Sequence, residues 1–140
     1  MKVMRVLGAL LVLIAIAAAI VPAATNCTGL VTLKSGKEIP MKCNWTGQAS
    51  IATALPLGLL GIALALAKRK ETQRALAVVA AGLGAALIML PTILIGTCAT
   101  FDMECNLIMK PAMLGMGILT ILIAGVVFFM SGRGDEAPTA

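Results

Sequence analysis

The 140-residue sequence has the length of one soluble domain, but 60% of it is hydrophobic and only 12% is charged. Soluble domains contain about a quarter charged residues, so this composition excludes an ordinary water-soluble fold and indicates a membrane protein. The net charge is +5, yet the basic residues form short flanks rather than a long run, which gives no support for nucleic-acid binding. Histidine is absent, which removes the commonest general base and metal ligand. We therefore expect neither conventional hydrolytic chemistry, nor catalytic residues, nor a bound metal or cofactor.

Four stretches without any charged residue are long enough to cross a bilayer as helices. They cover residues 6–24, 51–67, 75–97 and 112–130. We predict an all-α membrane protein with one transmembrane domain over residues 1–140, folded as a four-helix bundle. The first stretch follows Lys2 and Arg5 and ends in small residues, which is also typical of a cleaved signal peptide. Its length favours a retained helix, but cleavage stays open as an alternative.

The distribution of lysine and arginine predicts the orientation. The segment 68–74, KRKETQR, separates the second and third stretches and is basic enough to be held in the cytoplasm. Both termini then lie in the cytoplasm, with the tail at 131–140 and with outer loops at 25–50 and 98–111. Seven basic residues fall inside (Lys2, Arg5, Lys68, Arg69, Lys70, Arg74 and Arg133) and four outside (Lys34, Lys37, Lys42 and Lys110). We predict a multi-pass protein of the cytoplasmic (inner) membrane.

Small residues recur within the apolar stretches at spacings that place them on one helix face. Such residues let helix backbones approach closely in lipid, where close packing drives association. The predicted packing positions are Ala54, Gly58, Gly61, Ala80, Gly84 and Gly115. Glycine and alanine are also simply common in transmembrane helices, which explains the pattern about as well.

All four cysteines fall in the predicted outer loops, namely Cys27 and Cys43 in the first and Cys98 and Cys105 in the second. The outer compartment is where disulfides persist, so we expect two disulfide bonds. Four cysteines permit three pairings, and the sequence does not choose between them. Pairing within each loop is the simplest arrangement, whereas pairing across the loops would clamp the two halves of the chain together.

Each outer loop ends with the same motif, Met-X-Cys-Asn. The candidate motif residues are Met41, Cys43, Asn44 and Trp45 in the first loop and Met103, Cys105 and Asn106 in the second. Each motif follows a helix with a proline near its outer end, Pro22 or Pro91. The chain therefore resembles two parallel repeats, each a helical hairpin. Soft sulfur ligands of this kind could also hold Cu(I), although the absence of histidine makes simple packing the preferred explanation.

The segment from Thr28 to Pro40 has the strongest non-helical pattern in the chain. Alternating apolar residues flank the sequence Lys34-Ser35-Gly36-Lys37, which predicts a short β-hairpin with its turn at Ser35-Gly36. Such a hairpin would lie over the bundle and could serve as a surface for a partner.

The segments MKCNWTGQAS, residues 41–50, and IGTCATFDMECNLIMKPAMLGMG, residues 95–117, resemble the prokaryotic domain-of-unknown-function family 4418. The resemblance covers nearly the whole chain and implies a small protein with four spans. Asn44 and Asn106 stand where histidine is expected in many members, so a metal or redox role of those histidines would be lost here. The family has no established activity, and the resemblance implies only an accessory to an ABC-type permease system.

The leading hypothesis is a non-catalytic accessory or assembly subunit of a larger membrane complex, such as an ABC-type export permease. The four spans contain no ionisable residue, which disfavours transport by this chain alone. The expected partners are the lipid bilayer and another membrane protein or a second copy of the chain. The alternative is a thiol oxidoreductase that passes electrons from outer cysteines to quinone. The closely spaced pair Cys-X-X-Cys, which is usual in such enzymes, is missing, so we favour a protein that is not an enzyme.

Overall fold

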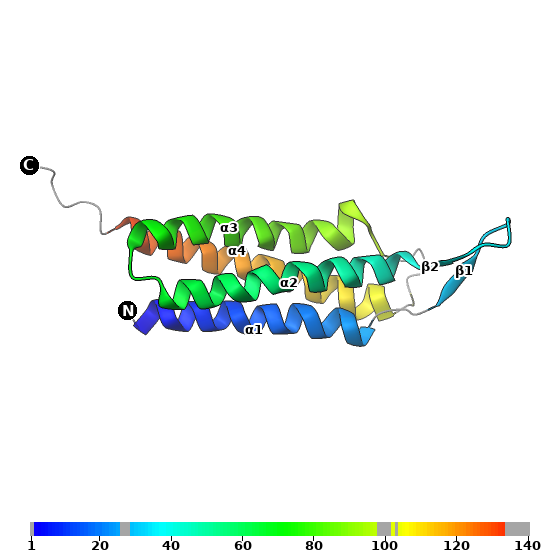
Figure 1. Cartoon of the computed structure of the whole chain (residues 1–140), viewed down its shortest axis with the longest axis horizontal. Helices are drawn as coiled ribbons and strands as arrows, with labels where there is room; N and C mark the ends of the chain where they lie inside the picture. Colours follow the sequence, from blue (N-terminus) through cyan, green and yellow to red (C-terminus); the bar gives the residue numbers. More distant parts are fainter. Residues whose placement is uncertain (1, 26–28, 98–101, 103, 134–140) are drawn as a thin grey trace, which may run out of the picture.

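The computed structural model describes residues 2–25, 29–97, 102 and 104–133. Four long helices make up most of the described chain, and they lie side by side (Figure 1). They are α1 (Lys2–Thr25), α2 (Lys42–Leu66), α3 (Lys70–Met89) and α4 (Lys110–Gly132). Each is long and apolar enough to cross a membrane, counting the short π-helical segments that extend α3 and precede α4. The prediction of an all-α fold with four apolar helices is confirmed.

The second helix begins well before the predicted apolar stretch. Residues 42–50, which the sequence places in the outer loop, form the first turns of α2. Polar side chains in these turns are satisfied by the helix itself, because the Ser50 hydroxyl donates to the Thr46 carbonyl oxygen over 2.7 Å. Hydroxyl groups that bond back one turn are tolerated in membrane helices. The helix therefore extends beyond its apolar stretch toward the end of the bundle where α1 ends. This end is the one predicted to lie outside the cytoplasm, and it is called the outer end below.

The helices form two hairpins. α1 packs along α2 and α3 along α4, while smaller contacts between α2 and α3 and between α1 and α4 close the bundle. The interior is aliphatic and thioether-rich, and its largest fully buried apolar side chains are Leu11, Leu57, Leu64, Leu87, Met109, Met113 and Val127. Outward-facing leucines such as Leu59 and Leu122 remain exposed. An apolar outer surface over the helices is what a bilayer requires.

A pair of glycines marks the closest approach of the helices in each hairpin. A Cβ atom added to Gly8 would lie 2.6 Å from the carbonyl oxygen of Gly61. In the second hairpin, a Cβ atom on Gly84 would lie 2.9 Å from the carbonyl oxygen of Gly117. Real Cβ atoms do not approach backbone this closely, so backbone touches backbone at these positions.

Two π-helical segments lie next to prolines at the outer end. Segment η1 (Leu90–Leu94) continues α3 and contains Pro91, and segment η2 (Cys105–Met109) precedes α4 close to Pro111. Proline lacks the backbone N–H that an α-helical ladder needs, and wider i→i+5 turns accommodate the loss. The amide of Ile95 accordingly donates to the carbonyl oxygen of Leu90 over 3.2 Å.

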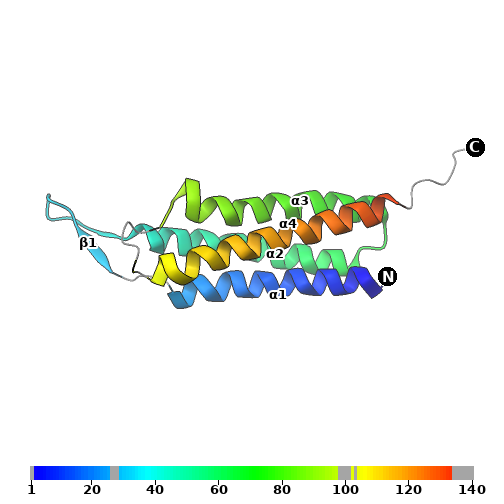
Figure 2. The same ribbon diagram turned by 180° about the vertical axis from the view of Figure 1, so that it is seen from behind.

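A small antiparallel sheet joins α1 and α2. Strand β1 (Leu30–Thr32) pairs with β2 (Glu38–Pro40) in the register Val31 opposite Ile39. Gly36 in the turn has a φ of 78°, which glycine adopts without strain. The predicted hairpin and its turn at Ser35-Gly36 are confirmed, but the hairpin does not lie over the bundle as expected. Figures 1 and 2 show that it projects beyond the bundle at the end opposite the α2–α3 turn, the start of α1 and the end of α4.

Candidate functional site

The two Met-X-Cys-Asn motifs lie at the outer end of the bundle, at the starts of the two returning helices. Cys43 is in the first turn of α2 and Cys105 is the first residue of η2, and both side chains are fully buried. Asn44 and Asn106 are half-buried, whereas Trp45 is exposed. Met41 is half-buried just before α2. Met103, Cys27 and Cys98 fall outside the described residues.

Helical spacing explains why both cysteines face inward. On α2 the side chains of Cys43, Thr46 and Ser50 are buried together at intervals of three and four residues. Cys105, Met109 and Met113 are likewise buried together, at intervals of four residues, across η2 and α4. Positions three and four residues apart share one helix face. The cysteine of each motif therefore begins the buried face of its helix.

A hydrogen bond at or beside each motif joins it to the end of the first helix of the other hairpin. The Thr46 hydroxyl, one turn after Cys43, donates to the carbonyl oxygen of Gly96 over 2.7 Å, just beyond α3. The Cys105 thiol donates to the carbonyl oxygen of Thr25 over 3.4 Å, at the end of α1. The two hairpins are thus joined crosswise at their outer ends.

The second motif also contacts its own loop, since the Thr97 hydroxyl donates a hydrogen bond to Oδ1 of Asn106.

Cys43 and Cys105 are not bonded to one another, and no two cysteines are at bonding distance within the part of the chain that the structure describes. The sequence did not single out Thr25, Thr46 or Gly96. Thr46 could have been found, because it lies one turn from Cys43 on the same helix face.

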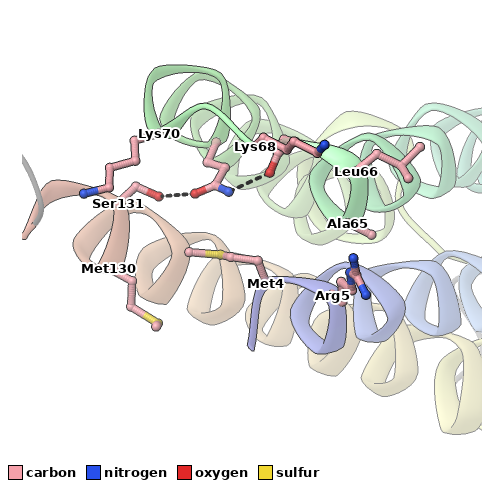
Figure 3. Close-up of a pocket in the computed structure, with 10 residues that line it drawn as sticks. Met4, Arg5, Ala65, Leu66, Lys68, Lys70, Met130 and Ser131 are labelled. Atoms are coloured by element: carbon pink, nitrogen blue, oxygen red, sulfur yellow. Dashed lines mark hydrogen bonds between the residues drawn. The ribbon is translucent and has the colours of Figure 1, made fainter. Parts of the chain in front are cut away.

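The sequence analysis also missed a second polar cluster, which lies beside the α2–α3 turn at the end of the bundle opposite the β-hairpin, called the inner end below. Gln73 near the start of α3 donates from Nε2 to the carbonyl oxygen of Ala67 over 2.8 Å. Its Oε1 accepts a hydrogen bond from the hydroxyl of Ser131 on α4 over 3.2 Å (Figure 3). Both side chains are buried and border a cavity of about 530 Å³. In the sequence, Gln73 and Ser131 stand out only as polar residues at the ends of apolar stretches, which does not predict that they meet.

The predicted packing residues divide between close helix contacts and open space. Gly61 and Gly84 lie at the backbone contacts, Ala54 and Ala80 are buried, and Gly58 is near Ala15. Gly115 has no neighbour within 4 Å of an added Cβ, whereas Gly117 contacts α3. The four-residue spacing of Gly117 and Met113 on the buried face explains why Gly117 is the contact position.

Neither the curated proteins nor the solved structures contain a significant match to this chain. One protein-family model does match, described as a domain of unknown function, and it covers residues 4–130. That span includes all four helices almost completely, the β-hairpin and both Met-X-Cys-Asn motifs. The chain therefore belongs to the DUF4418 family.

Proposed function

We propose that this protein is a non-catalytic accessory or assembly subunit of a larger membrane complex. The observation that carries the proposal is the projecting β-hairpin, whose apolar side chains are uncovered. Leu30 is 57% exposed, and Val31, Leu33 and Ile39 are also exposed. Exposed apolar surface with a defined shape is typical of protein interaction sites.

One face of the hairpin is apolar. Val31 and Ile39 are opposite one another in the register and share this face, which Leu33 continues. Thr32 and Glu38 form a polar pair on the opposite face, which also carries Leu30 and Pro40. An isolated two-stranded hairpin is marginal in water, so a partner that covers the apolar face would stabilise it. The basic residues near the other end of the bundle support placing the hairpin outside the cytoplasm.

Two disulfide bonds across the hairpins would hold the base of this surface rigid. The sulfur of Cys105 lies against the carbonyl oxygen of Thr25, and Cys27 follows Thr25 by only two residues. Two residues span at most about 7 Å, so this spacing along the chain would allow Cys27 to reach Cys105. We therefore propose the pair Cys27–Cys105, which the proximity of the sulfur to α1 supports.

The remaining pair is then Cys43–Cys98. Thr46, which shares the buried face of α2 with Cys43, bonds to Gly96, and Cys98 follows Gly96 by two residues. The alternative pair Cys27–Cys43 would be favoured if the β1–β2 strand pairing continued beyond Gly29 and Met41, which would bring these cysteines opposite one another. The pairing stops there, because α2 begins at Lys42. The crossed pairs would clamp the end of each first helix to the start of the other hairpin's returning helix.

Burial of both described cysteines also bears on the redox alternative. A thiol that reacts with a partner protein is usually exposed and activated, whereas a buried one is inert. Cys43 and Cys105 have no exposed surface. This supports a structural role for the cysteines over electron transfer to quinone.

Purification of the full chain from native membranes in a mild detergent tests the proposal. A variant with Val31→Ser, Leu33→Ser and Ile39→Ser should lose its co-purifying subunit, because the apolar contact on that face is gone. The matched control, Thr32→Ser with Glu38→Gln, changes the opposite face of the same strands and should keep the subunit. An ABC-type permease is the first partner to look for, given the family resemblance. A chain that purifies alone in every case would contradict the accessory role.

A photo-crosslinker at Val31 identifies the occupant of the surface. An adduct with a different membrane protein supports the accessory role, while an adduct of twice the chain's own mass indicates a homo-oligomer. A mixed disulfide trapped by a single cysteine variant would support the oxidoreductase instead.

A further inference from the structure

The cavity at the inner end of the bundle combines positive charge with an apolar wall. It opens between the start of α1, the end of α2, the start of α3 and the end of α4. Its volume of about 530 Å³ is within the range of small-molecule sites. The residues that line the cavity come from four helix ends, so the packing of the bundle holds them in place.

Three cationic side chains line the cavity, and they come from different elements. Arg5 belongs to α1, Lys68 to the α2–α3 turn, and Lys70 to the first turn of α3. No carboxylate lines it among the described residues, and Glu71, which is exposed, is the only described acid at this end of the bundle. Three cations on the lining of one cavity, without a counter-charge among the described residues, favour an anionic ligand.

The polar groups at the base of the cavity are already engaged with the protein. Gln73 uses its amide nitrogen on Ala67 and its amide oxygen on Ser131, which fixes the α2–α3 turn against α4. Figure 3 shows Lys70 on the side of Ser131 and Lys68 on the side of Leu66. The cationic side chains, rather than Gln73, are therefore the groups left to meet a ligand.

The rest of the lining is apolar and continues onto the outside of the bundle. Met4, Leu66 and Met130 border the cavity, and both Leu66 and Met130 are exposed on the surface that faces lipid. A small hydrated anion would make no favourable contact with these apolar side chains. An amphiphile with an anionic head and an acyl chain matches both parts of the site.

We infer that this cavity binds the phosphate headgroup of an anionic phospholipid, with Arg5, Lys68 and Lys70 around the phosphate and acyl chains along Leu66 and Met130. The same phosphate chemistry occurs in free inorganic phosphate, and the apolar wall favours the lipid. The inference is independent of the accessory role, because it concerns the opposite end of the bundle from the β-hairpin.

Native mass spectrometry of the full chain in detergent, titrated with phosphatidylglycerol, tests the inference. Phosphatidylglycerol should bind in preference to phosphatidylcholine, and inorganic phosphate should not compete at equal concentration. The variant Lys68→Gln with Lys70→Gln should bind phosphatidylglycerol about 30-fold more weakly, since each lysine near a lipid phosphate contributes on the order of a fivefold factor. The control Lys2→Gln with Arg69→Gln removes the same charge from the same end without touching the cavity, and it should bind normally.

Three outcomes would overturn the inference. Equal loss in both variants would show general attraction to the basic end of the protein rather than a site. If inorganic phosphate displaced phosphatidylglycerol at equal concentration, the cavity would be a site for a free anion rather than for a lipid. Residues 134–140 include Asp135 and Glu136. Lipid binding that appears only after these residues are deleted would show that the acidic tail, and not a lipid, occupies the cavity in the full chain. Thermal unfolding of each variant checks that a loss of binding is not a loss of fold.

Discussion

The two helical hairpins share a framework and differ in what connects their helices. Both have a glycine contact between their helices, Gly8 with Gly61 and Gly84 with Gly117, and both begin the returning helix with a buried cysteine. The first connection adds an exposed β-hairpin, whereas the second passes through short π-helical segments. The glycine contacts recur in both hairpins and hold their helices together, whereas the exposed β-hairpin is confined to the first and is the surface that we propose for recognition.

The largest expected effect comes from the shared cysteines. Each crossed disulfide would close a loop of roughly 50 to 80 residues, which the chain-entropy model values at about 4 kcal/mol. Cys43→Ser and Cys98→Ser should each lower the free energy of unfolding by about this amount, measured by denaturant titration in detergent. The double variant should lose no more than either single variant, because both remove the same bond.

Peptide mapping without reduction checks the pairing directly. It should recover Cys27 linked to Cys105 and Cys43 linked to Cys98. Peptides linking Cys27 to Cys43 would show that each hairpin is closed on itself, and the hairpins would then be joined only by their packing and hydrogen bonds.

The next largest effect comes from the glycine contacts. Gly61→Ala and Gly84→Ala should each destabilise by about 1–3 kcal/mol, because the added methyl group meets backbone that cannot move aside. Gly58→Ala and Gly82→Ala are matched controls in the same helices, since the added Cβ meets only ordinary contact or open space. These controls should be neutral or slightly stabilising, as alanine is the better helix former. Equal effects at contact and control positions would argue against close backbone packing.

A smaller effect is expected from the hydrogen bond that joins the hairpins at the outer end. Thr46→Val keeps the side-chain shape but removes the donor to Gly96, which should cost about 1 kcal/mol. Thr92→Val is the control, because its exposed hydroxyl bonds only within its own helix. Thermal unfolding of the two variants should separate them, and a loss as large for Thr92→Val would show that the link between hairpins is unimportant.

Periodicity and charge in the sequence were sufficient to predict the helices and the β-hairpin. They were not sufficient to predict which distant segments contact one another. Charge-free stretches identify helices because lipid excludes charge, and a Ser-Gly turn between alternating residues identifies the hairpin. The neighbours of Cys105 and Thr46 depend on how two hairpins face one another, which no local pattern encodes. The same limit explains why the sequence could not separate Gly117, which contacts α3, from Gly115, which does not, and why the cavity beside Gln73 and Ser131 was missed.

The smallest effect on stability should come from the feature that distinguishes the first hairpin. Replacing residues 30–40 by a Gly-Ser linker of equal length removes side chains that contact little of the bundle, so the free energy of unfolding should change by less than about 0.5 kcal/mol. The co-purifying subunit should nevertheless be lost. A large drop in stability would mean that the β-hairpin supports the bundle and belongs to the shared framework. Loss of the partner without loss of stability would separate the recognition surface from the scaffold, because only a surface outside the folding unit can be removed in this way.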